Sequence, residues 1–130
     1  AGLKEMMDKA FDDFTMLKNL IARPESANTW RPLLETLCPA DFATVVGEVN
    51  LEFDQAKVAE LLALQLRGGL TAAHIIEVNK KVAQNQRYTI VRKLAPLCVD
   101  LDQNVDAIEA GLSEWDRILC KQVLRDSIGR

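Results

Sequence analysis

The sequence predicts an all-α fold of about eight helices packed as stacked antiparallel hairpins. Apolar residues recur with the helical period of about 3.6 residues along most of the chain. Proline, glycine and helix-capping residues divide these runs at helix-sized intervals. A set of apolar positions also recurs with a period of roughly 30–33 residues, which is typical of an α-solenoid-like repeat.

Periodicity and chain breaks together place the elements, and no strand is expected. Pro24 and Pro39 cannot continue a preceding helix because they lack the backbone N–H. Gly68 and Gly69 supply a left-handed turn that other residues adopt at a cost. Pro32 suits a first helical turn. The expected helices lie near residues 3–22, 30–37, 40–49, 53–67, 72–82, 85–97, 103–111 and 114–127.

Three helix starts carry capping residues. Thr71 and Asp102 are expected N-caps, and Ser113 with Asp116 three residues later resembles a capping box. The helix at 53–67 is apolar around most of its circumference, so it is expected to be the central and most buried one.

The internal repeat sets the domain organisation. One constant shift along the chain aligns Phe42, Val45, Val49, Val58 and Leu61 with Ile75, Val78, Val82, Val91 and Leu94. A second, slightly shorter shift aligns Ile75, Val78, Val82, Arg87 and Leu94 with Val105, Ile108, Leu112, Arg117 and Leu124. We therefore predict one domain over residues 1–130, with three hairpin repeats in 39–130 and a divergent capping hairpin in 1–38.

Composition narrows the class of protein. The chain of 130 residues is 48% hydrophobic and 27% charged, which is ordinary for one globular domain. No apolar run approaches the roughly 18 residues that a transmembrane helix needs. Cys38, Cys98 and Cys120 are odd in number and widely spaced, so a reducing compartment, cytoplasmic or nuclear, is expected.

Charge and aromatic residues indicate a partner-binding face near the C-terminus. Residues 1–65 hold 6 basic and 11 acidic side chains, net −5, and residues 66–130 hold 10 basic and 8 acidic, net +2. Arg117, Lys121 and Arg125 recur every four residues, so they share a helix face. Arg87 and Trp115 complete the candidate set, although a solvated basic face and a packed tryptophan are the ordinary alternatives, also for Trp30.

No residue pattern predicts catalysis, a cofactor or a metal. His74 is the single histidine and has no nucleophile at a defined spacing, so a structural role is expected. Asp100, Asp102, Asn104 and Asp106 alternate like the start of a calcium loop, but the sequence lacks the turn glycine and closing glutamate of that loop. Cys98 and Cys120 lie among apolar neighbours, as buried thiols do. We therefore expect a protein that is not an enzyme.

The C-terminal half resembles a known family over about residues 53–127. The residues that carry the likeness are Leu94-Ala95, Val99-Asp100, Ile108-Glu109, Leu112, Cys120-Lys121 and Val123-Leu124. In order and spacing they are similar to the helical domain of unknown function at the N-terminus of the proline- and serine-rich protein of animals. The resemblance implies helical hairpins, no known catalysis and contacts with other proteins.

Two functions remain open from the sequence. The first is a protein-interaction or scaffolding module that is part of a larger protein and binds a protein or peptide. The second is a phosphate-directed binder, of nucleic acid or phosphoinositide, that uses the basic residues of the C-terminal half.

Overall fold

The computed structural model describes residues 4, 5, 7, 14–24, 26–49 and 51–128, and every regular element within them is helical. The α-helices, in chain order, are α2 (Phe14–Ala22), α3 (Ser26–Thr29), α4 (Arg31–Glu35), α5 (Pro39–Gly47), α6 (Glu52–Gln65), α7 (Ala72–Lys81), α8 (Arg87–Leu94), α9 (Val105–Ala110) and α10 (Glu114–Ile128). Two 3₁₀ turns, η1 (Gln84–Gln86) and η2 (Ala95–Leu97), flank α8. The all-α prediction is confirmed.

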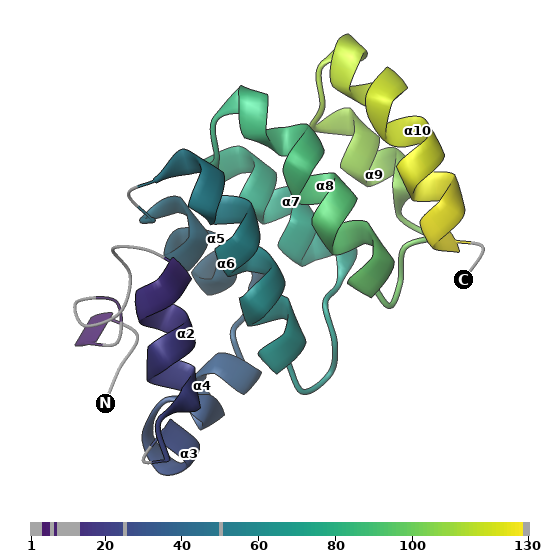
Figure 1. Ribbon diagram of the computed structural model, residues 1–130. Coiled ribbons are helices and arrows are strands. Elements are labelled where there is room, and N and C mark those ends of the chain that lie inside the picture. Colours follow the sequence, from purple (N-terminus) through teal and green to yellow (C-terminus); the bar gives the residue numbers. More distant parts are fainter. Residues whose placement is uncertain (1–3, 6, 8–13, 25, 50, 129–130) are drawn as a thin grey trace.

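The helices pack in two rows (Figure 1). In one row α7 packs between α5 and α9. In the other row, called the second row below, α6 packs against α2 and α8, and α8 packs against α10. Contacts between α5 and α6 and between α7 and α8 join the rows. The short helices α3 and α4 lie with α2 at one end of the molecule, and α10 lies at the other.

The core lies between the rows and includes most of the apolar positions that the two shifts along the sequence align. Most members of the aligned sets are fully buried; they are Phe42, Val45, Val49, Val58, Ile75, Val78, Val82, Val91, Leu94, Ile108, Leu112 and Leu124. Leu61 and Val105 are half-buried and pack against this core. Trp30 is also in the core, so the packed alternative for this tryptophan is confirmed.

Most expected helices are present, with three differences. The structure has an additional short helix, α3, whose four residues carry no apolar periodicity. The helix expected at 85–97 is divided into η1, α8 and η2, and α8 ends before Pro96, which cannot continue the α-helical hydrogen bonding. The helix expected at 3–22 is seen as α2 and in the helical residues 4, 5 and 7, and residues 3, 6 and 8–13 of that prediction lie outside the described residues.

Helix 53–67 was expected to be the central and most buried one, and its apolar circumference is only partly buried. In α6 the side chains of Phe53 and Leu64 are 68% and 64% exposed. Helix α6 does contact α2, α4, α5 and α8, so it lies centrally among the described helices. Apolar residues around a whole helix therefore do not mean that every one of those side chains is buried.

The loop between α6 and α7 is built around Gly69. This residue has φ +84°, a conformation that costs other residues about 1–2 kcal/mol. A Cβ atom there would also lie 2.6 Å from Cγ1 of Val99. The close approach allows the Val99 N–H to donate to the Leu70 carbonyl at 2.9 Å, next to a parallel bridge between Leu70 and Cys98. The predicted left-handed turn is confirmed at Gly69.

Two of the three predicted caps are confirmed. Thr71 and His74 form a capping box at the start of α7, and the Asp116 N–H donates to Ser113 Oγ at 3.2 Å at the start of α10. Asp102 is not the cap of α9, which begins at Val105 after Asn104. Asn104 instead donates its side-chain N–H to the Asp100 carbonyl at 2.7 Å, which tightens the loop before α9.

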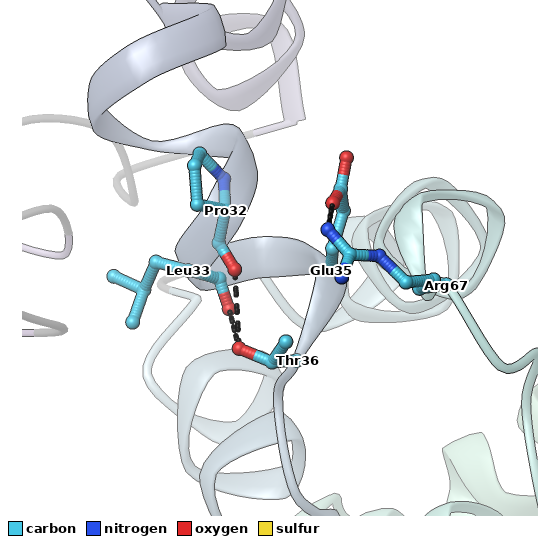
Figure 2. Close-up of polar contacts among 5 residues, drawn as sticks. All are labelled: Pro32, Leu33, Glu35, Thr36 and Arg67. Carbon is cyan, nitrogen blue, oxygen red and sulfur yellow. Dashed lines mark hydrogen bonds and ion pairs between the residues drawn. The ribbon is translucent and has the colours of Figure 1, made fainter.

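The first helices are tied to α6 by polar contacts near its end. Arg67 donates its backbone N–H to the Glu35 carbonyl at 3.0 Å, and its guanidinium pairs with the Glu35 carboxylate at 2.6 Å. Figure 2 shows this pair beside Thr36, whose hydroxyl lies 3.1 Å from the Pro32 carbonyl. Because the ion pair is exposed, we expect it to contribute under about 1 kcal/mol.

Asn79 is a buried amide whose removal should stabilise the fold. It is 3% exposed, and neither side-chain atom has a hydrogen-bond partner in the described part of the chain. The shift that aligns Phe42 with Ile75 also aligns Val46, which is fully buried, with Asn79. Asn79→Val should raise the free energy of unfolding by about 1 kcal/mol, because an unpaired buried polar group costs about 1–3 kcal/mol.

Urea denaturation followed by circular dichroism tests this expectation. Asn79→Ala is the control, because it removes the amide without filling its space and should gain less. A loss of stability in Asn79→Val would show that the amide makes a hydrogen bond, for example to a buried water.

Candidate partner-binding surface on the C-terminal helix

Helix α10 positions four of the five candidate residues on its solvent side, namely Trp115 and three basic residues. It packs on α8 through Cys120 and Leu124, which are buried. Arg117, Lys121 and Arg125 are exposed and follow one another by one turn each, as their spacing predicts. The ammonium of Lys121 and the guanidinium of Arg125 have no hydrogen bond or ion pair among the described residues. Both charges are therefore open to a partner.

Arg117 and Arg87 are held by backbone carbonyls. Arg117 Nε donates to the Leu112 carbonyl at 3.3 Å. Arg87 is half-buried, and its guanidinium donates to the carbonyls of Asn79 at 2.8 Å and Gly111 at 3.3 Å. The second shift along the sequence aligns these two arginines. Their guanidinium groups bind two successive carbonyls, those of Gly111 and Leu112, just after the C-terminus of α9. The dipole of α9 favours positive charge at that end.

An apolar cluster accompanies the basic residues of α10. Trp115 is 68% exposed, Ile118 is 60% exposed and Leu119 is 39% exposed. Their spacing of three and four residues places them on one side of the helix. The sequence singled out Trp115 alone. The other two were not found, because apolar residues at helical spacing usually mark the buried face.

Two surface hollows border this cluster. One, of about 260 Å³, lies beside α10 and is lined by Glu109, Glu114, Arg117, Ile118 and Lys121. The other, of about 420 Å³, lies at the turns before α8 and α10 and is lined by Gln84, Asn85, Ser113, Trp115 and Asp116. Trp115 and Ile118 therefore each border a shallow, open hollow of the surface.

His74 has a structural position. The side chain is 6% exposed, and its Nδ1 accepts the Thr71 N–H at 3.2 Å. This acceptor role leaves Nε2 as the protonated nitrogen, which donates to the Leu37 carbonyl at 3.1 Å. The ring also makes an edge contact with Phe42, with centroids 5.2 Å apart. His74 thus joins the start of α7 to the segment that leads into α5.

Asp100 caps α7 from a distant part of the chain. Its Oδ1 accepts the Ala72 N–H at 2.8 Å and the Cys98 thiol at 3.3 Å. Of the alternating side chains that resemble a calcium loop, Asp100 is therefore directed at the start of α7. Among the residues described, no group of three His, Cys, Asp or Glu side chains is placed to hold a metal ion.

The three cysteines carry free thiols with different surroundings. Cys38 is exposed and Cys120 is buried. Burial raises the pKa of the Cys98 thiol from 9.0 to about 11, and Asp100 contributes through its negative charge and its side-chain hydrogen bond. Burial likewise raises the pKa of Cys120 to about 11, with smaller contributions from the charges of Asp116 and Glu109.

These pKa values predict an order of alkylation. At pH 8 a thiol with a pKa near 11 is about one part in a thousand thiolate, and the thiolate is the nucleophile. Iodoacetamide should therefore modify Cys38 first, and the rate at Cys98 should rise about tenfold per pH unit up to pH 10. Mass spectrometry of timed samples measures this order. Modification of Cys98 at the same rate as Cys38 at pH 8 would contradict it.

No protein-family model, curated protein or solved structure matches the chain. In the part of the chain that is described, every helix is too short or too polar to cross a lipid bilayer.

Proposed function

We propose that this chain is a non-catalytic protein-binding or scaffolding module whose partner surface lies on α10. The observation that carries the proposal is the exposed apolar cluster of Trp115, Ile118 and Leu119 beside two cations, Lys121 and Arg125, that have no ion pair within the described part of the chain. Tryptophan and arginine are the residues most enriched at the energetic centres of protein interfaces.

The packing supports a stacked-hairpin architecture for this module. Successive hairpins α5–α6, α7–α8 and α9–α10 would each contribute one helix to each row, with α2, α3 and α4 as the cap. Such an α-solenoid-like stack buries each hairpin against its neighbours and leaves long outer surfaces. Extended surfaces of this kind suit the binding of other proteins.

The family resemblance and the thiols agree with this proposal. The resemblance to the helical domain of the proline- and serine-rich protein implies contacts with proteins and no known catalysis. The free thiols of Cys38, Cys98 and Cys120 suit a reducing compartment, cytoplasmic or nuclear. We therefore place the module inside the cell, as part of a larger protein.

A phosphate-directed binder is the second candidate, since Lys121 and Arg125 are unpaired. However, Glu109 and Glu114 line the same hollow as Lys121. Their carboxylates repel phosphate, whereas a protein surface can match mixed charges. A protein partner is therefore the better fit to this face.

Affinity capture from native lysate with matched variants tests the function. The test variant is Trp115→Ala/Ile118→Ala on α10. The control variant is Phe53→Ala/Leu64→Ala on α6, which removes apolar side chains that are equally exposed. We expect protein partners that bind the wild type and the control but are lost with the test variant. Circular dichroism establishes that both variants remain folded.

Two results would contradict the proposal. If the α10 variant retains the same proteins, this surface is not the one that binds them. Retention of nucleic acid or anionic lipid alone, with release between about 50 and 200 mM salt, would favour the phosphate-directed candidate.

A further inference from the structure

The outer face of α10, defined by Trp115, Ile118, Leu119, Lys121 and Arg125 and here called the α10 face, has a definite shape and charge. We propose that it receives an amphipathic α-helix that carries acidic residues along one flank. This inference rests on the proposed function, and it names the kind of partner.

The packing of the second row indicates why the occupant is a helix. Helices α6, α8 and α10 follow one another in that row, and each presents one side to the helix before it. Ile118 lies about 160° around α10 from the buried Cys120, since each residue advances about 100°. The α10 face is thus the side on which one more helix of the row would pack.

The spacing of the apolar side chains fits helix packing. Trp115, Ile118 and Leu119 stand three and four residues apart, which produces the ridges and grooves that interdigitate with a second helix. Helix-in-groove recognition uses apolar anchors at this spacing on the partner. The adjoining hollows allow partner side chains to enter on both sides of the ridge formed by Trp115 and Ile118.

The positions of Lys121 and Arg125 indicate which side of the partner helix carries its acidic residues. Lys121 and Arg125 lie about 20–60° around the helix from Ile118, on the side away from Trp115 and Leu119. Both are exposed and have no partner among the residues that the structure describes, whereas Arg117 is held by the Leu112 carbonyl. Carboxylates along one side of the partner helix would meet these two cations. Charge complementarity of this kind increases the association rate and rejects basic partners.

A lipid surface fits this face less well than a helix does. Amphipathic helices that lie on membranes have a polar face rich in Lys and Arg. On α10, the carboxylates of Glu114 and Asp126 are also exposed, and a flat anionic membrane would meet them together with the cations, whereas a helix can place its acidic residues beside Lys121 and Arg125 alone. Asp126 lies about 100–140° around α10 from these two cations and accepts a hydrogen bond from Gln122 at 2.7 Å.

Selection from a phage-displayed library of helices tests the inference directly. The library presents a three-to-four-turn helix scaffold with randomised surface positions to the wild-type chain. Counter-selection uses the Trp115→Ala/Ile118→Ala variant, so that only binders of the α10 face are retained. We expect enrichment of helices with apolar residues at i, i+3, i+4 and i+7 and Glu or Asp along one flank.

The affinity of an enriched helix provides the second measurement. Fluorescence anisotropy should show at least about tenfold weaker binding to Lys121→Glu/Arg125→Glu, because desolvated charge pairs are lost and like charges oppose. A Glu-to-Lys version of the same helix should regain affinity for that variant. The control is Lys57→Glu on α6, which changes an exposed lysine far from the α10 face and should leave the affinity unchanged.

Several outcomes would overturn the inference while leaving the protein-binding function standing. These are an absence of enrichment over counter-selection, enrichment of basic or neutral helices, and equal binding to the charge-reversed variant. Sedimentation of the chain as a dimer that Lys121→Glu/Arg125→Glu dissociates would instead assign the face to a second copy. Retention on phosphatidylserine vesicles without binding to any helix would assign it to lipid. Capture of the same protein partners by the wild type and by the Trp115→Ala/Ile118→Ala variant would overturn both proposals.

Discussion

Replacing Leu94 with alanine should lower the free energy of unfolding by about 2–5 kcal/mol. Leu94 is fully buried at the end of α8, in the middle of the second row. Its removal leaves a cavity that close-packed neighbours fill only in part, so the loss includes both transfer and cavity costs. Urea denaturation followed by circular dichroism at 222 nm gives the value.

Two other leucines serve as matched controls, because they have the same side chain as Leu94 and differ from it in burial. Leu61 occupies the position in α6 that aligns with Leu94, but it is half-buried, so Leu61→Ala should cost about half as much. Leu64 is largely exposed, and Leu64→Ala should change stability by less than about 0.5 kcal/mol. Equal losses at all three positions would contradict the assigned packing of the second row.

The same three leucines show how far the sequence determines the fold. Periodicity predicted the helices that contain them, because a stripe of apolar residues needs a partner surface. It did not rank their burial, because α6 has apolar residues on several sides and only the packing selects which ones face solvent. Phe53 and Leu64 are therefore exposed in a helix that the sequence indicated as the most buried.

The sequence predicted only part of the candidate surface, for a similar reason. The four-residue spacing of Arg117, Lys121 and Arg125 is a local property, and it placed them correctly on one exposed side of α10. The exposure of Ile118 depends on where the neighbouring helices are, and spacing contains no such information. The hydrogen bonds that occupy Arg87 depend on the positions of Asn79 and Gly111, so they are equally invisible in the sequence.

Asp100 shows this limit most clearly, because its carboxylate caps a helix that starts 28 residues earlier. We expect Asp100→Ala to lower the free energy of unfolding by about 2 kcal/mol, since the Ala72 N–H at the start of α7 loses a charged acceptor. Asp100→Asn keeps an acceptor oxygen at the same place and should lose less. Urea denaturation of both variants measures the difference.

The reactivity of Cys98 separates the loss of this cap from general loosening of the fold. Burial is the main cause of the high pKa of Cys98, and the Asp100 side chain adds to it through its charge and its hydrogen bond. Without that carboxylate the pKa should fall, so Asp100→Ala should speed alkylation of Cys98 at pH 8. Cys120 is buried elsewhere and should keep its rate. Faster alkylation of both thiols would mean that the whole fold of the variant opens more often. An unchanged free energy of unfolding would mean that Asp100 does not help to hold α7 in place.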